Sequence, residues 1–284
     1  IKKVKFHHKS FYLRFGAPKG HWLFDIGMRM DDQFGGYATR GIREGDLGNG
    51  WKDYLNALIP QNAGEGEYFD GNYLGSEHIK LTYQNKDYYL STYLENYYDD
   101  FSGMGKLNGM DGLWGVEYRT NKYQSINNIV LEYYQSTNQS GPLHGLDFSI
   151  VKKTGGADNY YNHALYPGWS HWGMSMGNPF VASPIYNKNG DLTFLYTRVK
   201  AIHLGWSGDI TKEWTYRAKL SFNRTWGTPF KPIPEILENF STFAEFKYVP
   251  NKWQGWSFIG SVAFDIGDIY DDNLGFQFKV HKKF

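Results

Sequence analysis

The sequence has no cysteine among its 284 residues, which excludes disulfide bonds and thiolate metal sites. It also has no excess of one charge: the formal net charge is +1 at pH 7, so no basic field is available to recruit nucleic acid. No apolar run approaches the roughly 18 residues that a membrane-spanning helix needs. A membrane role would therefore require strands closed into a barrel, because backbone groups in lipid must pair with one another.

Aromatic side chains are abundant instead. Phe, Trp and Tyr make up 19% of the chain, although the mean hydropathy is only -0.58. This combination is typical of strands whose residues alternate between lipid and water. A soluble carbohydrate-binding β protein would have the same composition, so composition alone leaves both classes open.

A two-residue alternation of apolar and polar side chains recurs along the chain and predicts strands with one apolar face. It is clearest in residues 273–284, where Leu274, Phe276 and Phe278 belong to an apolar row that ends on Phe284. An aromatic last residue is typical of the final strand of bacterial outer-membrane barrels. We therefore predict that Phe284 is the signal read by the barrel assembly machinery.

Eleven segments have this alternation, and their connections are short and long in turn, as in outer-membrane barrels with short periplasmic turns and long outer loops. The segments are residues 10–15, 21–30, 77–84, 88–97, 113–120, 126–135, 192–207, 214–226, 242–249, 256–266 and 273–284. About ten residues per strand, tilted by about 45°, rise roughly 23 Å, close to the apolar band of about 25 Å. The pattern predicts an all-β, antiparallel transmembrane barrel with long extracellular loops.

We predict a single barrel domain over residues 1–284, with loop insertions at 31–75 and 136–191. The first insertion contains a short amphipathic helix near residues 51–59, ended by Pro60. Eleven is an odd number, whereas closed bacterial barrels have an even one. We therefore expect at least one further strand upstream of Ile1; the alternative is that one of the long loops hides a strand.

The polar rows of the last strands carry charged side chains that a water-facing lumen would accommodate. The predicted lumen-lining residues are Arg217, Lys219, Glu245, Lys247, Asp265 and Lys279.

The most unusual loop, residues 155–180, combines aromatic rings with Asp, His, Asn and Gly. The predicted glycan-binding residues are Asp158, Tyr160, Tyr161, His163, Tyr166, Trp169, His171 and Trp172. Aromatic rings can stack on the C–H faces of sugars while polar groups bind the hydroxyls. A loop that plugs the lumen, or one that packs on itself, would have a similar composition.

Catalytic and metal-binding motifs are missing from the sequence. It contains no G-x-S-x-G, H-E-x-x-H, P-loop or nucleotide-binding pattern. His163 and His171 with Asp158 could bind a metal ion, but no close two-histidine spacing supports it. Acidic pairs such as Asp31 and Asp32 could hold Ca²⁺, although such pairs more commonly form turns. We predict no enzyme activity, no cofactor and no metal site.

Several segments carry a family resemblance. They are G-G-A-D-N-Y-Y-N-H (155–163), G-W-S-H-W-G-M-S-M-G-N-P-F (168–180), R-V-K-A-I-H-L-G (198–205), W-G-T-P (226–229) and F-D-I-G-D (264–268). In these motifs the chain resembles the Wzi-type capsule assembly family of outer-membrane proteins. The resemblance implies a large barrel closed by internal segments, which acts as a surface lectin for capsular polysaccharide. It also implies more strands than this chain supplies, and it carries over no catalytic residue.

We therefore predict a non-catalytic barrel in the outer membrane of a Gram-negative bacterium, with loops at the cell surface that bind or organise capsular or other surface polysaccharide. Its expected partners are that polysaccharide, outer-membrane lipid and the barrel assembly machinery, and no nucleic acid. The alternative is a porin or substrate channel with the same wall. A third possibility, a soluble glycan-binding β-sandwich, predicts solubility without detergent.

Overall fold

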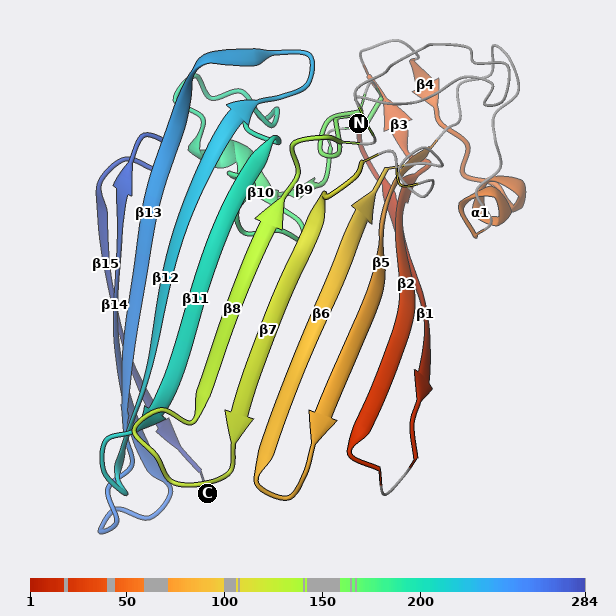
Figure 1. Ribbon diagram of the computed structural model, residues 1–284. Helices are drawn as coiled ribbons and strands as arrows, with labels where there is room; N and C mark the ends of the chain where they lie inside the picture. The colour runs from red at the N-terminus through yellow and green to blue at the C-terminus, as the bar shows by residue number, and fades with distance from the viewer. Residues whose placement is uncertain are drawn as a thin grey trace.

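A computed structural model of the protein describes residues 1–17, 20–39, 44–58, 71–99, 106, 108–139, 141, 159–163, 165, 166 and 168–283. Eleven antiparallel strands form one curved sheet in chain order (Figure 1). They are β1 (Lys5–Phe15), β2 (Trp22–Phe34), β5 (Gly71–Gln84), β6 (Tyr88–Tyr98), β7 (Gly112–Thr120), β8 (Asn128–Gln135), β11 (Val199–Asp209), β12 (Trp214–Gly227), β13 (Pro232–Tyr248), β14 (Trp256–Gly267) and β15 (Asn273–Lys282). The predicted all-β, antiparallel architecture is confirmed.

The remaining elements are small. They are β3 (Tyr37–Ala38), β4 (Gly45–Asp46), α1 (Trp51–Leu58), β9 (Ser170–His171), β10 (Met174–Ser175) and a 3₁₀ turn, η1 (Pro184–Tyr186). The predicted short helix is confirmed as α1. Within the described residues, no helix has both the length and the apolar character needed to cross a membrane.

The connections β1–β2, β5–β6, β7–β8, β11–β12 and β13–β14 are all short and lie at one end of the sheet, where the C-terminus also lies (Figure 1). The other end carries the long connections β2–β5, β6–β7 and β8–β11, together with the brief connections β12–β13 and β14–β15. Strands β1 and β15 are the two edges of the sheet. In the part of the chain that the structure describes, these edges are not paired with each other, so the sheet is an open wall.

Several strand boundaries differ from the alternation. Strand β1 begins at Lys5 rather than at residue 10, β2 runs to Phe34 rather than to residue 30, and β5 begins at Gly71 rather than at residue 77.

Strand β13 begins at Pro232. The sequence instead predicts a loop before residue 242, because this stretch contains prolines. The pairing of β13 with β14 ends at Asn239 and Gly267, so the N-terminal part of β13 pairs only with β12. A proline, which has no N–H to donate, is tolerated where a strand has a neighbour on one side only. Strand β11 begins at Val199 rather than at residue 192, since the preceding residues leave the sheet plane and bury Phe194.

The outer face of the wall is apolar and exposed. One row across neighbouring strands runs through Leu204, Leu220, Thr242 and Phe264. On the edge strand β15, the side chain of Phe276 is 76% exposed. A contiguous apolar surface of this extent needs an apolar environment to cover it.

Aromatic rings gather on this outer face near the end with short turns. Trp214 stacks on Tyr248 with ring centroids 4.7 Å apart, and Trp22 lies 5.1 Å from Tyr83. Amphipathic rings in a band near strand ends are typical of the boundary between a bilayer and water. Their position agrees with the predicted membrane-facing wall.

On the opposite face, glycines make room for tyrosine rings from the neighbouring strand. A Cβ atom at Gly115 would lie 2.2 Å from the ring of Tyr93, its cross-strand partner. A Cβ atom at Gly27 would likewise lie 2.2 Å from the ring of Tyr12, its cross-strand partner on β1. These rings can therefore lie flat on the wall, and the Tyr93 hydroxyl donates to a Glu132 carboxylate oxygen 2.5 Å away.

Candidate functional site

The described residues between 159 and 198 (159–163, 165, 166 and 168–198) are called the inner loop from here on. They pack on the polar face of the wall, and this face is called the inner face. At one flank, Phe6 of β1 meets Trp169 edge-on, with ring centroids 6.2 Å apart. Gln33 of β2 donates a hydrogen bond of 2.9 Å to the carbonyl oxygen of Gly168. These contacts tie the inner loop to the first two strands.

The inner loop also reaches the opposite flank. The hydroxyl of Tyr270, in the turn between β14 and β15, lies 3.5 Å from the carbonyl oxygen of Pro179. Burial raises the pKa of Tyr270 to about 12, so this hydroxyl remains a donor at neutral pH. Lys188 forms a surface ion pair of 2.9 Å with Asp271. The inner loop therefore crosses the inner face from β1 to the turn before β15.

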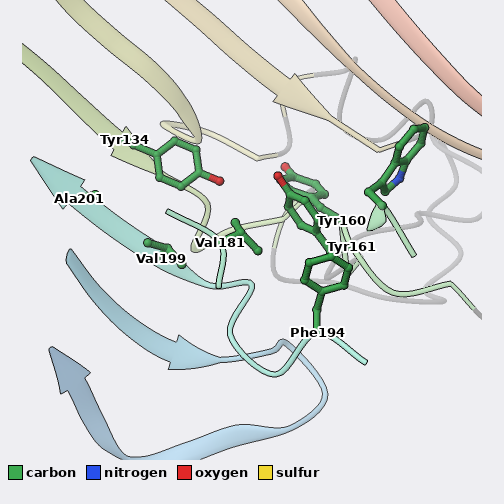
Figure 2. Packing of buried hydrophobic residues seen from close by; sticks show 8 residues of the cluster. Tyr134, Tyr160, Tyr161, Val181, Phe194, Val199 and Ala201 are labelled. Atoms are coloured by element: carbon green, nitrogen blue, oxygen red, sulfur yellow. The ribbon is translucent and has the colours of Figure 1, made fainter. Parts of the chain in front are cut away.

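A buried apolar cluster fixes the inner loop to the middle of the wall (Figure 2). Its members are Tyr134, Tyr160, Tyr161, Trp169, Val181, Phe194, Val199 and Ala201. Tyr134 comes from β8, while Val199 and Ala201 come from β11. The rings of Tyr161 and Phe194 lie 5.0 Å apart in this cluster.

A buried carboxylate, Asp111, holds the entry to the inner loop. It accepts backbone N–H groups from Gln139 at 2.7 Å and Asn138 at 3.0 Å, and Tyr160 lies 3.5 Å away. Burial raises the pKa of Asp111, and these hydrogen bonds oppose the rise. The side chain of Gln139 in turn donates to the carbonyl oxygen of Thr197 at 2.7 Å. The two ends of the loop are thereby joined.

Two cavities lie between the inner loop and the wall, and Gly177 and Asn178 line both of them. The smaller one, called the Trp169 cavity, has a volume of about 340 Å³. Its lining residues are Phe6, Arg29, Asp31, Leu74, Gly75, Ser76, Glu95, Tyr97, Tyr161, Trp169, Met176, Gly177 and Asn178. The indole N–H of Trp169 has no hydrogen-bond partner within the described structure, although this side chain is only 2% exposed.

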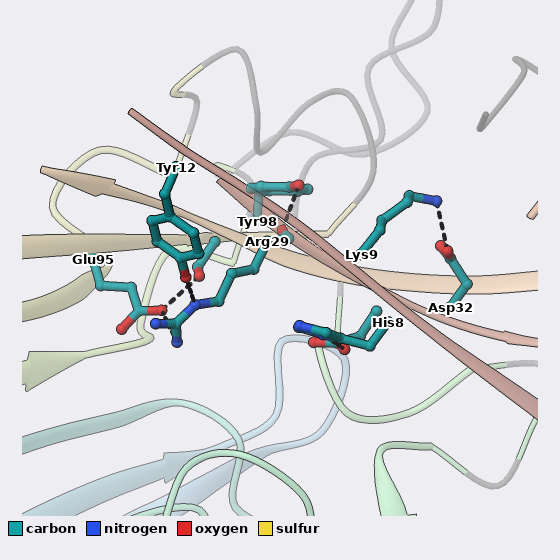
Figure 3. Close-up of polar contacts among 9 residues, drawn as sticks. His8, Lys9, Tyr12, Arg29, Asp32, Glu95 and Tyr98 are labelled. Atoms are coloured by element: carbon teal, nitrogen blue, oxygen red, sulfur yellow. Dashed lines mark hydrogen bonds and ion pairs between the residues drawn. The ribbon is translucent and has the colours of Figure 1, made fainter. Parts of the chain in front are cut away.

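Charged groups form one side of the Trp169 cavity (Figure 3). The guanidinium of Arg29 lies between the hydroxyl of Tyr12 and Glu95, 3.3 Å from the carboxylate. The hydroxyl of Ser76 donates to the same carboxylate at 2.6 Å. The cavity thus combines aromatic faces with fixed donors and acceptors, which is how proteins orient small polar ligands.

The larger cavity, called the His203 cavity, has a volume of about 820 Å³. It is lined by Met174, Ser175, Gly177, Asn178, Pro179, Phe180, Ser183 and Tyr186 of the inner loop, and by His203, Lys219, Ser221, Asn223, Ser241, Asp265, Tyr270 and Asn273. Both cavities are in the size range of about 300–1,000 Å³ that is common for ligand sites.

A histidine–serine pair lies in the His203 cavity. His203 Nδ1 and Ser221 Oγ are 2.7 Å apart on neighbouring strands. Glu132 is the cross-strand neighbour of His203 on β8, but its hydrogen bond is with Tyr93. In the described part of the chain, no carboxylate bonds to the second ring nitrogen of His203. The pair therefore lacks the orienting third member that activates a serine nucleophile.

The predicted glycan-binding residues fall into two groups. Tyr160, Tyr161, Tyr166 and Trp169 are buried, and His163 is half-buried; of these, Tyr161 and Trp169 line the Trp169 cavity. By contrast, His171 is exposed and Trp172 is 86% exposed, with φ of 53°. Asp158 lies outside the described residues. The structure therefore does not bring the eight residues together on one surface.

The predicted lumen-lining residues lie on the inner face. Lys219 and Asp265 line the His203 cavity. Arg217 and Glu245 form an ion pair of 3.1 Å and, with Lys247, line a third cavity of about 220 Å³ nearer the short turns. Lys279 follows the same alternation on β15, opposite Ile259. The other predicted position, Phe284, lies outside the described residues.

Sequence reasoning did not single out the most polar part of the His203 cavity, which His203, Ser221 and Asn223 form. All three belong to inward rows of clearly alternating strands. That alternation shows which way a side chain points but not which inward positions face a cavity. The partner surface, residues 174–186, comes from a loop without periodicity.

His163 provides a pH-sensitive contact in the inner loop. Burial lowers the pKa of His163 to about 4. Its Nδ1 accepts backbone N–H groups from Leu165 at 3.2 Å and Tyr166 at 3.4 Å, which requires this nitrogen to be unprotonated.

This geometry predicts that acid loosens the inner loop. An unfolded histidine takes up a proton near pH 6.5, so the loop keeps its full stability above that pH and loses it as the pH falls towards about 4. We expect the protection factors of the Leu165 and Tyr166 amides in hydrogen exchange to fall over this range, relative to amides of β12. His163→Asn, which keeps an acceptor but does not titrate, should flatten the dependence; an unchanged pH profile in the variant would contradict this assignment.

Comparisons with known proteins place the chain in no family. No family model matches the sequence, and no curated protein sequence matches it. Among solved structures, the fold is similar to the crystal structure of a Pseudomonas aeruginosa FadL homologue, with a TM-score of 0.37 and 9% sequence identity. The alignment covers 98% of this chain and 65% of that one, so the chain spans less than two thirds of its length. The resemblance to the Wzi-type family stays a prediction.

Proposed function

We propose that the protein is a non-catalytic barrel wall of the bacterial outer membrane that binds surface polysaccharide, such as capsule, beside its inner loop. The Trp169 cavity carries this proposal. Its unbonded indole N–H, the ring of Tyr161 and the carboxylate of Glu95 offer a sugar both an apolar surface and hydrogen-bond partners. Buried donors normally have a partner, so a buried donor without one, on a residue that lines a cavity, points to a polar ligand.

The exposed apolar outer face and the aromatic band support the membrane location. Sheet and inner loop together would separate lipid from a polar interior, and the long connections would face the cell surface. Capsular polysaccharide could then reach the cavities from the end with long connections. The resemblance to the capsule assembly family agrees with this orientation.

A cavity-filling variant tests the proposal. Met176 lines the Trp169 cavity, and we expect Met176→Trp to lower the affinity for polysaccharide at least tenfold by occupying that space. Detergent-solubilised protein would be applied to an array of bacterial capsular polysaccharides. Met110→Trp is the matched control, because Met110 is 55% exposed and lines neither cavity. Equal binding by both variants, or no binding by the unmodified protein, would contradict the proposal.

A second candidate function is a porin or substrate channel. It is favoured by charged side chains on the inner face between the inner loop and the short turns. There, Arg217, Glu245 and Lys247 line the third cavity. A channel should show stable conductance of constant size in a planar bilayer. A wall blocked by its inner loop should show none until that loop is removed.

A further inference from the structure

The His203 cavity contains a buried donor without a partner. Asn223 of β12 is 2% exposed and lines the cavity, yet its Nδ2 has no hydrogen-bond partner within the described structure. Its cross-strand neighbour Asn239 directs its own amide nitrogen to Ser241 and Asp265, at 3.0 and 3.3 Å. Leaving a buried amide donor unsatisfied is unfavourable. A ligand oxygen in this cavity would remove that cost.

The cavity also contains an exposed lysine, Lys219, and one carboxylate, Asp265. Lys219 lies on the same strand and face as Asn223, and no ion pair joins it to an acidic side chain in the described ranges. Asp265 lines the same cavity and accepts from the neutral Ser241 at 2.5 Å, whereas Glu245 pairs with Arg217. The ammonium of Lys219 lies 5.9 Å from the centroid of the Phe243 ring. Because no ion pair in the described ranges occupies this ammonium, it can pair with a ligand carboxylate.

Aromatic rings line the other side of the His203 cavity. Phe180 and Tyr186 come from the inner loop, and Tyr270 from the turn before β15. Tyr186 and Tyr270 meet edge-on with centroids 6.0 Å apart, which holds both rings in place. Rings opposite a polar strand suit a ligand with apolar faces and polar edges. A sugar ring has that distribution.

We propose that the His203 cavity binds acidic sugar residues, that is, sugars that carry a carboxylate. Lys219 holds the carboxylate, and Asn223 donates to an oxygen of a neighbouring ring. The two Cα atoms are four residues apart along β12, about 13 Å, so the cavity accommodates more than one sugar. This inference rests on the proposed polysaccharide binding and adds the chemical class of the polysaccharide.

The test compares tetragalacturonate with its carboxyl-reduced counterpart, which has the same rings without the charges. Binding to the detergent-solubilised protein would be measured by calorimetry at two salt concentrations. We expect the acidic form to bind at least tenfold more tightly and to weaken as salt rises, because screening acts on the Lys219 contact. Equal affinity for both forms would overturn the proposal.

Two substitutions test which residues cause the preference for the acidic form. Lys219→Met should abolish the preference for the acidic form while affinity for the reduced form is kept, and Asn223→Ala should weaken both forms. Lys247→Met is the matched control: Lys247 is also an inward lysine, but it lines the third cavity. A preference that survives in Lys219→Met, or disappears in Lys247→Met, would overturn the proposal.

The two proposals can fail separately. Binding of neutral capsular polysaccharides on the array, without binding of tetragalacturonate, would reject the acidic-sugar inference and leave polysaccharide binding in place. Absence of binding in both experiments would reject both.

Discussion

Replacing Leu220 by arginine is expected to lower the free energy of unfolding by about 2–4 kcal/mol, the cost of placing a charge on the lipid face of a membrane barrel near the bilayer midplane. Leu220 lies in the middle of β12 and of an apolar row on the outer face. The measurement is equilibrium unfolding in lipid vesicles, followed by tryptophan fluorescence. In a soluble β-sandwich with this face in water, the same change would cost little.

Ser261→Arg is the control for Leu220→Arg. Ser261 lies on the inner face of β14, opposite Glu245, and its hydroxyl is 3.4 Å from that carboxylate. An arginine there would face water and an acidic neighbour, so we expect a change within about 0.5 kcal/mol. Equal costs for the two substitutions would argue against the assignment of the outer face to lipid.

Replacing Trp169 by alanine is expected to destabilise the inner loop by about 3–5 kcal/mol, as for other large-to-small changes in a packed core. The ring is 2% exposed, contacts Phe6 of β1 and belongs to the cluster that fixes the loop to the wall. The hydrogen bonds between strands do not involve this side chain, so the wall should remain folded. Hydrogen exchange should show increased opening at the Leu165 and Tyr166 amides while β12 stays protected.

Trp172→Ala provides the comparison within the same loop. Trp172 is 86% exposed and contacts only the ring of His171 among the aromatic pairs of the described structure. We expect a change within about 0.5 kcal/mol, which is usual for surface positions. A similar increase in loop opening in both variants would show that the buried cluster does not hold the loop.

The wall could be predicted from the sequence because each strand carries its own two-residue pattern. The short turns are also local features, and they set the direction of each following strand. The start of β13 could not be predicted in this way, since Pro232 is tolerated only where β14 has already ended. That depends on the length of a neighbouring strand rather than on the residues around the proline.

The site was predictable in composition but not in arrangement. Trp169 and Trp172 occur three positions apart in the same aromatic segment, yet one is buried and the other is exposed. Nothing in their local sequence separates them. The difference arises because the inner loop folds back on β1, β8 and β11, which are distant in the chain.

Local residue patterns were enough to predict the strands, their two faces and the end of the wall with the long connections, because alternation and turns act over a few residues. The crossing of the inner face by the inner loop, and the two cavities beside Gly177 and Asn178, became visible only in the folded chain. Such cavities form where surfaces from distant segments fail to fill the space between them. Their position therefore depends on packing between elements, which no local pattern records.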